Sequence, residues 1–419
     1  MFRLIYNLGF LLILPIVLMR LIFKSKGEPL YRSSFGERFG YFKGKKPGRY
    51  LWIHAVSVGE VVAAFPLIRN LVNRGYPCLV TSATPAGKQR IEQLLGDEVE
   101  KCFVPLDLAI AVKRFISSNM PLALIMVETE LWPNIIAECK KKGVKIFLVN
   151  GRMSKASAKT YHKVSFLTAS MFEKIDFCGV QTVRHRNRFV SLGVRKDQIE
   201  ITGNLKFDIP LPDTNSGGVE EARALVGERP VLLGASTHEG EEVMLLQAFK
   251  KVREKLPNLL LILAPRHLNR LEQIVSLISD CRLNPAILSQ TSRIVPTDDL
   301  LLIDKMGVLP TFYCCAQVAF VGGSMVPLGG HNLLEGVRAG CAVIMGPFVE
   351  NIEDIAREFE TNGAMSLVLD QLELEAEIYN ILNDQQKREN LVSAASDILT
   401  SNSGALRMTE SMILEHLDR

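Results

Sequence analysis

The sequence predicts an α/β protein with two doubly wound domains, preceded by an apolar N-terminal helix. After residue 50, short apolar runs alternate with longer segments of helical periodicity, a pattern typical of parallel sheets covered by helices on both faces. A stretch rich in Pro, Gly and short polar residues, 209–218, interrupts this alternation near the middle of the chain, as a linker between domains does. The 419 residues, 47% of them hydrophobic, are enough for two cores and exclude a disordered, collagen-like or disulfide-stapled chain.

The first element is an apolar segment without charge from Leu4 to Met19. It is short against the roughly 17 to 25 residues that span a bilayer, although Arg3 and Arg20 can lengthen it by snorkelling. A cleaved signal peptide begins in the same way, but residues 19–23 offer no small-residue cleavage site. A core helix of a soluble protein is the second alternative. We expect residues 1–27 to form an uncleaved membrane anchor, either spanning the bilayer or lying in its interface.

Charge is distributed unevenly along the chain. Residues 1–50 contain ten Lys or Arg side chains against Glu28 and Glu37, a net charge of +8, which leaves −4 for the rest. This excludes a uniformly basic nucleic-acid-binding protein, so no nucleic-acid partner is expected. The basic side chains that follow the apolar segment are Arg20, Lys24, Lys26, Arg32 and Arg38. By the positive-inside rule they keep the following domains in the cytoplasm, where anionic membrane lipids attract them. The eight cysteines form no Cys-x-x-Cys pair, in agreement with a reducing compartment.

The predicted strands of the first domain are residues 50–54, 78–81, 122–127 and 145–149, and those of the second are 231–234, 259–264, 318–321 and 342–345. Doubly wound sheets bind ligands beyond the carboxyl ends of their strands. We therefore expect the functional residues in the turns after these strands, and we expect the two domains to face one another across a cleft.

Glu60 follows the first strand and has two interpretations. Ser57-x-x-Glu60 has the form of a capping box, in which the Glu60 carboxylate folds back on the backbone amide of Ser57. The alternative is a general base at the end of a strand, with Gly59 allowing a substrate to approach it.

Two carboxylates, Glu128 and Glu130, follow the strand at 122–127. Carboxylates in that position commonly point into a cleft, although one of the two can instead cap the helix that begins near Pro133. Lys206 closes the first domain beside the linker. It is placed to meet a phosphate, with an exposed solvated lysine as the alternative.

The second domain has four polar turns at successive strand ends. The turn at 234–241 has capping-box form at Ser236 and Glu239, and such a turn can also bind an anion through its backbone amides. Arg266 ends the strand at 259–264 and suits a phosphate or a carboxylate. Residues 304–308 open a further helix, and two glycine pairs within 321–335 precede Glu335, which can bind ribose hydroxyls. Together these turns favour a nucleotide-binding domain.

Several motifs are absent from the sequence. There is no phosphate-binding Gly-x-x-x-x-Gly-Lys-Ser/Thr loop, no Gly-x-Gly-x-x-Gly after the first strand, no His-Glu-x-x-His and no Asp-x-Asp pair. Nucleotide hydrolysis and hydride transfer therefore lack their usual signals, and neither a cofactor nor a metal is expected.

Longer motifs occur in a fixed order along the chain: HAVSVGE at 54–60, ETELWPN at 128–134, NGRMS at 150–154, TGNLKFD at 202–208, STHEGE at 236–241, APRH at 264–267, FVGGS at 320–324 and GGHNLLE at 329–335. With these motifs the chain resembles the 3-deoxy-D-manno-octulosonic acid (Kdo) transferases of Gram-negative bacteria, from the anchor to about residue 350. The resemblance implies a GT-B fold, with a first half that binds a lipid acceptor and a second that binds CMP-Kdo. It also implies an inverting, metal-independent transfer of Kdo to a lipid A precursor, lipid IVA, at the bacterial inner membrane.

The resemblance also implies roles for single residues. Glu60 matches the general base of the family, which deprotonates the primary hydroxyl of the acceptor sugar. Glu130 and Lys206 match positions that stabilise the transition state, with Lys206 near the departing CMP phosphate. The segments that match the CMP site contain Pro265, Arg266, Met306, Gly307, Val308, Asn332, Leu333, Leu334 and Glu335. Two departures from the family pattern are Asn204, where Ser is common, and Val308, where Glu can occur, so the last CMP contact is expected from the backbone.

The domains expected from these observations are an anchor at 1–27, an acceptor-binding domain at 28–208, a linker at 209–218, a CMP-Kdo-binding domain at 219–400 and a C-terminal helix at 401–419. In other GT-B enzymes such a helix crosses back to the first domain. Two alternatives remain open, a sugar-nucleotide 2-epimerase acting on a soluble substrate and a non-catalytic, membrane-bound sugar-nucleotide sensor.

Overall fold

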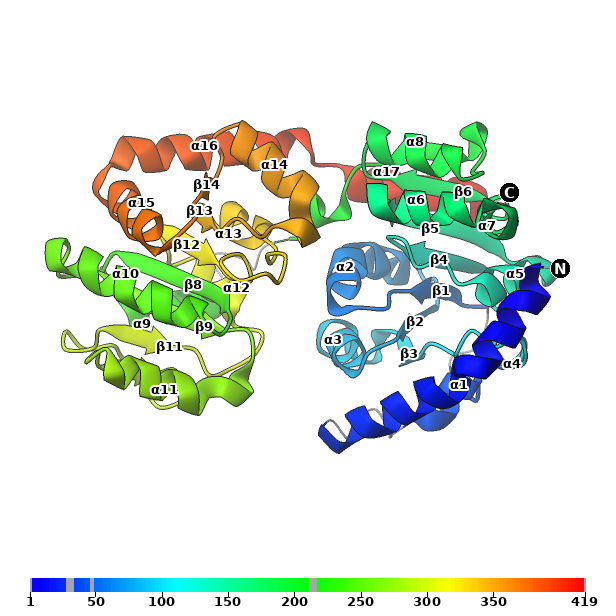
Figure 1. Cartoon of the computed structure of the whole chain (residues 1–419), viewed down its shortest axis with the longest axis horizontal. Coiled ribbons are helices and arrows are strands. Elements are labelled where there is room, and N and C mark those ends of the chain that lie inside the picture. The colour runs from blue at the N-terminus through cyan, green and yellow to red at the C-terminus, as the bar shows by residue number, and fades with distance from the viewer. Residues whose placement is uncertain (1, 28–33, 46–48, 211–216, 418–419) are drawn as a thin grey trace. The chain divides into compact units, whose positions relative to one another are not determined.

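The computed structural model describes residues 2–27, 34–45, 49–210 and 217–417. The chain divides into two compact units. Unit 1 contains residues 1–209 and 402–419, and unit 2 contains residues 210–401. Each unit is a parallel sheet with helices on both faces (Figure 1). This confirms the predicted GT-B type of fold with two doubly wound domains and an apolar N-terminal helix. Most of the predicted linker, 211–216, lies outside the described residues.

Unit 1 is built on seven strands in the order β3-β2-β1-β4-β5-β6-β7. The strands are β1 (Leu51–His54), β2 (Cys78–Ser82), β3 (Glu100–Phe103), β4 (Ala123–Val127), β5 (Lys145–Gly151), β6 (Phe177–Val180) and β7 (Ile199–Ile201). All of them pair in parallel. The strand order reverses between β1 and β4. This position is called the switch point of the sheet, and doubly wound sheets bind their ligands there.

The helices of unit 1 are α1 (Phe2–Gly27), α2 (Val58–Asn73), α3 (Pro85–Leu95), α4 (Ala109–Asn119), α5 (Pro133–Lys141), α6 (Lys155–Lys163), α7 (Ser165–Phe172), α8 (Val183–Ser191) and α17 (Ala405–Leu417). They bury the sheet on both faces. In β1, Leu51 and Ile53 belong to one core cluster and Trp52 to the other, because successive side chains of a strand point to opposite faces. This explains why the strand is a continuous apolar run.

The C-terminal helix α17 belongs to unit 1. Its Met412 and Ile413 complete the core cluster that contains α2. The carboxylate of Asp208 accepts hydrogen bonds from the backbone amides of Gly404 and Leu406, at 2.9 and 2.6 Å. Asp208 ends the short helix η5 (Leu205–Asp208), so the last helix of the chain is attached directly to the segment that carries Lys206.

Unit 2 is built on a second sheet of seven strands in the order β10-β11-β9-β8-β12-β13-β14, which reverses between β8 and β12. The strands are β8 (Val231–Thr237), β9 (Leu260–Pro265), β10 (Pro285–Ile287), β11 (Leu300–Leu302), β12 (Val318–Val321), β13 (Ala342–Met345) and β14 (Ser366–Leu367). The helices are α9 (Gly217–Val226), α10 (Glu241–Lys255), α11 (Leu271–Asp280), α12 (Leu309–Tyr313), α13 (Leu334–Arg338), α14 (Glu353–Thr361), α15 (Gln371–Asn383) and α16 (Gln385–Ser401).

The basic cluster predicted after the apolar segment is not uniform. Arg20 and Lys24 are exposed, and Arg32 lies outside the described residues. Arg38 is buried with 4% of its surface exposed. Its guanidinium lies 4.1 Å from the centre of the Phe103 ring and donates a hydrogen bond to the carbonyl of Ala83. The expectation that Arg38 meets membrane lipids is therefore wrong, because its side chain is enclosed within unit 1.

Candidate active site

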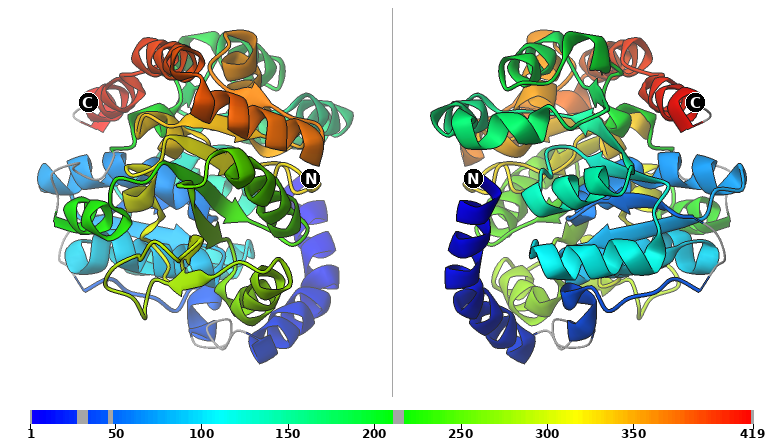
Figure 2. Two further views of the ribbon diagram at one scale, coloured as in Figure 1. Left: turned by 90° about the vertical axis from the view of Figure 1, so that its left-hand side faces the viewer. Right: turned by 90° about the vertical axis from the view of Figure 1, so that its right-hand side faces the viewer.

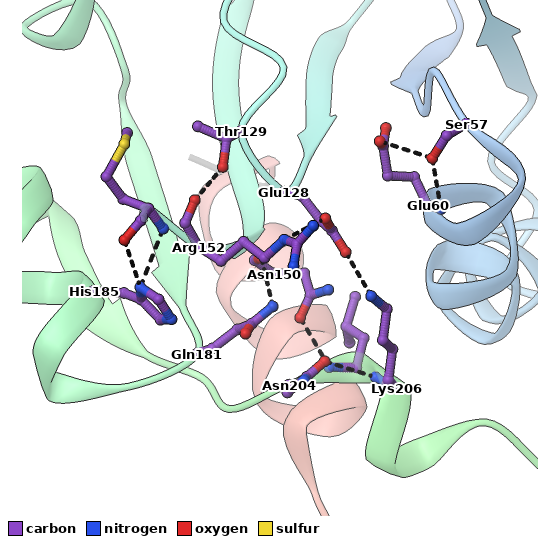
Figure 3. Close-up of polar contacts among 12 residues, drawn as sticks. Ser57, Glu60, Glu128, Thr129, Asn150, Arg152, Gln181, His185, Asn204 and Lys206 are labelled. Atoms are coloured by element: carbon purple, nitrogen blue, oxygen red, sulfur yellow. Dashed lines mark hydrogen bonds and ion pairs between the residues drawn. The ribbon is translucent and has the colours of Figure 1, made fainter. Parts of the chain in front are cut away.

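Glu60 lies at the switch point of unit 1, in the first turn of α2 directly after β1. One carboxylate oxygen accepts a hydrogen bond from the backbone amide of Val56 at 2.7 Å. The other accepts from the hydroxyl of Ser57 at 2.9 Å (Figure 3). The Ser57 oxygen in turn accepts from the Glu60 amide at 3.3 Å. Ser57 thus caps α2 as predicted, but the Glu60 carboxylate accepts from the amide of Val56 and the hydroxyl of Ser57 instead of from the Ser57 amide.

The capping contacts do not keep Glu60 fully ionised. Burial raises the pKa of the Glu60 carboxyl to about 7, and the negative charges of Glu130 and Glu128 act in the same direction. The hydrogen bonds from Val56 and Ser57 favour the ionised form and partly oppose this. A carboxylate that ionises near neutral pH is matched to general base catalysis. The two interpretations of Glu60 are therefore compatible: the cap orients the side chain, and burial raises its basicity.

Gly59 has no packing reason to be glycine. A Cβ atom at this position would meet only the Ser57 hydroxyl, at 4.0 Å. The residue is exposed and lies in the first turn of α2 beside Glu60. The open space fits a position at which a substrate approaches the Glu60 carboxylate.

Glu128, at the end of β4, holds two cations. One of its oxygens lies 3.0 Å from the ammonium of Lys206, and the other lies 2.7 Å from the guanidinium of Arg152 (Figure 3). These charges lower the pKa of Glu128 against the opposing effect of burial. Only 17% of the Lys206 side chain is exposed, so the alternative of a solvated lysine is wrong. Its charge is held near the ends of β4 and β5.

Three features constrain the backbone near Glu128, Arg152 and Lys206. Glu128 has a φ of 59°, which a non-glycine residue adopts only when its surroundings enforce it. The side chain of Asn150, at the end of β5, accepts a hydrogen bond from the amide of Leu205 at 3.0 Å. The side chain of Asn204 accepts from the amide of Lys206 at 3.1 Å. These contacts attach η5 to β5, and they bring Lys206 to Glu128.

Glu130 has a different set of contacts from Glu128. Its carboxylate accepts a hydrogen bond from the indole of Trp132 at 3.0 Å. Burial raises its pKa, and the charge of Glu128 adds to this effect. Neither glutamate caps α5, because Asp107 accepts the amides of Asn134 and Ile135 at the start of that helix. The structure thus brings Glu60 and Glu130 within electrostatic reach of one another, and it pairs Lys206 with Glu128.

In unit 2 the turn after β8 differs from its prediction. Helix α10 begins at Glu241, after Gly240, and Glu239 is exposed, so the capping box expected at Ser236 and Glu239 does not form. The fully buried Glu241 folds back instead. Its carboxylate accepts amide hydrogen bonds from His238, Gly323, Ser324 and Met325, between 2.8 and 2.9 Å. One side chain therefore fixes the loops after β8 and β12 to each other at the switch point of this unit.

Close approach of the two loops explains why residue 322, directly after β12, is a glycine. A Cβ atom on Gly322 would lie 2.5 Å from the carbonyl oxygen of Ser236, far inside van der Waals contact. Any larger residue at this position would separate the loops after β8 and β12. The glycine is thus a structural requirement of the switch point.

Arg266 lies beside a group of histidines that the sequence did not single out. Its backbone amide donates to the carbonyl of Thr237, which places it at the ends of β8 and β9. The Nε2 atoms of His238 and His331 are 2.7 Å apart, and their rings stack at 5.0 Å. Burial lowers the pKa of His331 to about 4, and the charge of Arg266 contributes to the shift. The histidine pair is therefore neutral near pH 7, with one ring donating and the other accepting.

The remaining residues predicted to contact CMP divide into accessible and buried groups. Met306 is 58% exposed, and Gly307 has a φ of 86° in the turn before α12. Leu333 and Leu334 are 0% and 1% exposed and belong to the interior, so they can reach a nucleotide only through their backbone. The predicted residues with exposed or half-buried side chains are Arg266, Met306, Val308, Asn332 and Glu335, and Pro265 is buried at the end of β9.

The polar groups at the two switch points suit different tasks. Unit 1 offers a carboxylate that ionises near neutral pH and a lysine held in an ion pair, which serve proton abstraction and stabilisation of negative charge. Unit 2 offers Arg266 and backbone turns, which serve phosphate binding. Within the described parts of the chain, no three His, Cys, Asp or Glu side chains are grouped as metal ligands.

Sequence reasoning missed the partners of these groups. Arg152, which pairs with Glu128, lies in the NGRMS motif, but the sequence alone gives no indication of this ion pair. His238 and His331 also lie within motifs, STHEGE and GGHNLLE. Their positions at strand ends were the available signal, but contacts between residues 93 positions apart are set by the fold.

Comparison with known proteins supports a single family. A family model described as 3-deoxy-D-manno-octulosonic-acid transferase (kdotransferase) matches residues 33–209. The chain is 33% identical to the 3-deoxy-D-manno-octulosonic acid transferase of Haemophilus influenzae, over 100% of both chains. It is also 33% identical to the protein of the same name from Bordetella pertussis, over 89% of both chains. A solved UDP-N-acetylglucosamine 2-epimerase resembles the fold with a TM-score of 0.61, at 13% identity, over 89% of this chain and 96% of the epimerase.

Proposed function

The chain belongs to the 3-deoxy-D-manno-octulosonic acid (Kdo) transferase family and is a glycosyltransferase of lipopolysaccharide biosynthesis; from this premise we propose that it transfers Kdo from CMP-Kdo to the lipid A precursor lipid IVA, with Glu60 as the general base. The observation that carries the proposal is the carboxylate of Glu60 at the switch point of unit 1, with a pKa of about 7.

In the proposed reaction, Glu60 accepts the proton of a primary hydroxyl on the acceptor sugar. The hydroxyl oxygen forms a bond to the anomeric carbon of Kdo. The bond from that carbon to the phosphate oxygen of CMP breaks, and the electron pair leaves with CMP. Attack from the side opposite the leaving phosphate inverts the anomeric centre.

Lys206 is proposed to stabilise the negative charge that develops as the phosphate departs. Its ammonium is held 3.0 Å from Glu128, so the position of this cation within unit 1 is fixed before the reaction. The resemblance assigns a similar role to Glu130, whereas the contacts favour Glu128 as the residue that positions Lys206. Glu130 acts on Glu60, because its charge raises the pKa of the base.

Unit 2 is proposed to bind CMP-Kdo. Arg266 lies at the ends of β8 and β9, next to the switch point, with a half-buried side chain, and it is the cation proposed to meet the phosphate. The turn at Met306 to Val308 and the start of α13 supply backbone groups for the cytidine and ribose. We propose that these protein cations stabilise the phosphate charge without a metal or another cofactor.

Helix α1 provides the membrane connection. Residues Ile5–Ser25 are long and apolar enough to cross a membrane, with a mean hydropathy of 2.1. We propose that α1 holds the enzyme at the bacterial inner membrane, with both units in the cytoplasm, where it meets the lipid acceptor and anionic lipids.

The test uses the full chain in detergent micelles with CMP-Kdo and lipid IVA. Release of CMP and formation of a Kdo-bearing lipid are followed together, the second by mass spectrometry. We expect both products from the wild type and a loss of at least about a hundredfold in turnover from Glu60→Gln. Glu173→Gln is the matched control, because it changes an exposed glutamate of unit 1 that follows α7, at the amino end of β6 and away from the predicted site.

Other outcomes would reject the proposal. Wild-type turnover by Glu60→Gln would remove the general base. Epimerisation of a soluble sugar nucleotide without lipid product would favour the epimerase alternative. Binding of CMP-Kdo without any turnover of the wild type would favour a sensor.

A further inference from the structure

Helix α1 has two apolar faces. Its half-buried residues recur at the spacing of one helical face: Tyr6, Asn7, Phe10, Leu14, Val17, Leu18, Leu21 and Ser25. The opposite face is also apolar and consists of Ile5, Leu8, Leu12, Ile16, Met19 and Phe23, which are 51–80% exposed. Residues three and four apart share a face of an α-helix, so each set forms a continuous stripe. We call the half-buried set the packed stripe and the exposed set the exposed stripe.

The packed stripe is attached to unit 1 by apolar contacts. Phe10, Leu14, Val17 and Leu18 pack against a buried cluster of Leu106, Leu108 and Ala111. These residues surround the start of α4, and Figures 1 and 2 show α1 running beside this part of unit 1. The contacts extend along more than two turns of the helix.

Polar contacts fix the N-terminal end of α1 to the same surface. The side-chain oxygen of Asn7 accepts a hydrogen bond from the amide group of Asn134 at 2.7 Å. Tyr6 is hydrogen-bonded to the carboxylate of Asp107. Asp107 and Asn134 are 2% and 0% exposed, and Asp107 also caps α5. The attachment therefore involves buried polar groups at the base of a helix in the globular unit.

These contacts conflict with a helix that crosses the bilayer. If Ile5–Ser25 spanned the membrane, α1 would have to leave the surface of unit 1 and uncover the apolar cluster at Leu106. If it spanned while still attached, Asp107 and Asn134 would have to enter hydrocarbon, where polar groups are costly. A helix lying along the membrane surface meets neither cost.

The exposed stripe has the composition of a lipid-facing surface. Large apolar side chains form it, with Leu12 as much as 80% exposed. Arg20 and Lys24 are exposed and follow each other on one flank of the stripe, one turn apart. Arg3 gives the N-terminal end a positive charge as well. Cations at both ends of an apolar stripe match an anionic monolayer on one side of the membrane.

We propose that α1 lies in the plane of the membrane, attached to unit 1 by its packed stripe and inserted into an anionic lipid monolayer by its exposed stripe. Both ends of α1 are then on the same side of the membrane as the two units. This extends the proposed membrane association, on which it rests, by specifying how the helix sits. It also fixes which surface of unit 1, the one around α4 and the start of α5, lies nearest the lipid.

The first test determines on which side of the membrane the N-terminus lies. The full chain carries one epitope tag before Met1 and a different tag after Arg419, and protease is added to spheroplasts and to inverted inner-membrane vesicles. We expect both tags to be cleaved in inverted vesicles and protected in spheroplasts. Cleavage of the N-terminal tag in spheroplasts, with the C-terminal tag protected, would show a spanning helix and overturn the inference while leaving membrane association intact. Absence of the protein from membranes would overturn both.

The second test measures binding to vesicles of phosphatidylethanolamine and phosphatidylglycerol by flotation. Leu12→Gln should weaken the partition of the protein onto these vesicles about tenfold, because one exposed leucine no longer enters the monolayer. Leu372→Gln is the matched control, since Leu372 is 74% exposed in unit 2, and it should bind as the wild type does. Equal binding by both variants would reject lipid contact at the exposed stripe. Loss of a dimer in Leu12→Gln without a change in vesicle binding would instead assign the stripe to a second copy of the chain.

Discussion

The ammonium of Lys206 lies 3.0 Å from a carboxylate oxygen of Glu128, and the second oxygen of Glu128 lies 2.7 Å from the guanidinium of Arg152. The lysine comes from η5, after β7, and the glutamate ends β4. The ammonium of Lys206 is thus held by a carboxylate at the switch point of the sheet. Glu128, with its φ of 59°, is the residue on which this placement depends.

Glu128→Gln should lower turnover more than Glu130→Gln. The change removes the charge that holds Lys206 and leaves two cations facing a neutral amide, so we expect a loss of about a hundredfold in kcat. Glu130→Gln removes one charge and leaves an amide oxygen that can still accept the hydrogen bond from the Trp132 indole, and we expect a loss below about tenfold at pH 8. CMP release at pH 8 measures both. A larger loss from Glu130→Gln would support the assignment implied by the family resemblance.

The activity should depend on pH through Glu60. A general base must be ionised, so the rate should rise with pH through the Glu60 pKa of about 7 and level off above it. The charge of Glu130 raises this pKa, so Glu130→Gln should move the rising limb to lower pH. The pH profile of kcat/KM reports the pKa of the unliganded enzyme. An unchanged limb in Glu130→Gln would show that another group controls the profile.

The sequence predicted the strands at the centre of each sheet and missed those near the edges. The central strands β1, β4, β8 and β9 are buried on both faces and read as continuous apolar runs. The strand β3 begins with Glu100 and Lys101, and β7 and β14 contain three and two residues. Such short or polar strands exist because a neighbouring strand pairs with them, which local sequence does not report.

For the site, the sequence identified the positions and not the contacts. Glu60, Lys206 and Arg266 were found because they follow strands or close a domain. The pairing of Lys206 with Glu128, and the hydrogen bond between His238 and His331, join residues 78 and 93 positions apart. Both contacts result from strand order, which brings distant turns to one edge of a sheet. The same capping pattern also had two outcomes. The Ser57 side chain caps α2, whereas Ser236 and Glu239 form no cap at the start of α10.

Gly59→Ala tests access of the acceptor to Glu60 separately from the stability of the fold. Because the added methyl group enters open space in the first turn of α2, the fold should be unaffected or stabilised by about 0.5 to 1 kcal/mol. We expect KM for the lipid acceptor to rise at least about tenfold, because the methyl group lies where the acceptor approaches Glu60. Thermal unfolding and acceptor titration check the two effects. Gly218→Ala is the control, since Gly218 is a glycine with open space in the first turn of α9. Unchanged KM in Gly59→Ala would place the acceptor elsewhere.

Arg266→Ala should weaken CMP binding and also change the titration of His331. Loss of a charged contact to phosphate should raise the Kd for CMP about tenfold or more. Because the charge of Arg266 helps to lower the pKa of His331, that pKa should rise in the variant. Calorimetry measures the affinity, and the imidazole proton signals in NMR report the pKa. Arg293→Ala, which changes an exposed arginine of unit 2, should alter neither. Unchanged CMP affinity in Arg266→Ala would remove Arg266 from the nucleotide site.

The C-terminal helix should affect catalysis through Asp208. This carboxylate accepts the amides of Gly404 and Leu406 at the start of α17, and it lies two residues after Lys206 in η5. Asp208→Ala removes a helix cap, which costs about 1 kcal/mol of unfolding free energy. It also releases η5 from α17, so we expect kcat to fall at least about tenfold.

A matched variant separates these two effects. Asp370 caps α15 in unit 2 through the amide of Glu373 at 2.9 Å, so Asp370→Ala should cost a similar unfolding free energy and leave kcat within about twofold of the wild type. Denaturant unfolding and CMP release measure both quantities for each variant. Hydrogen exchange should become faster in α17 for Asp208→Ala and in α15 for Asp370→Ala. Equal turnover in the two variants would mean that α17 supports only the core of unit 1, and that the contacts of Asn150 and Asn204 suffice to place Lys206.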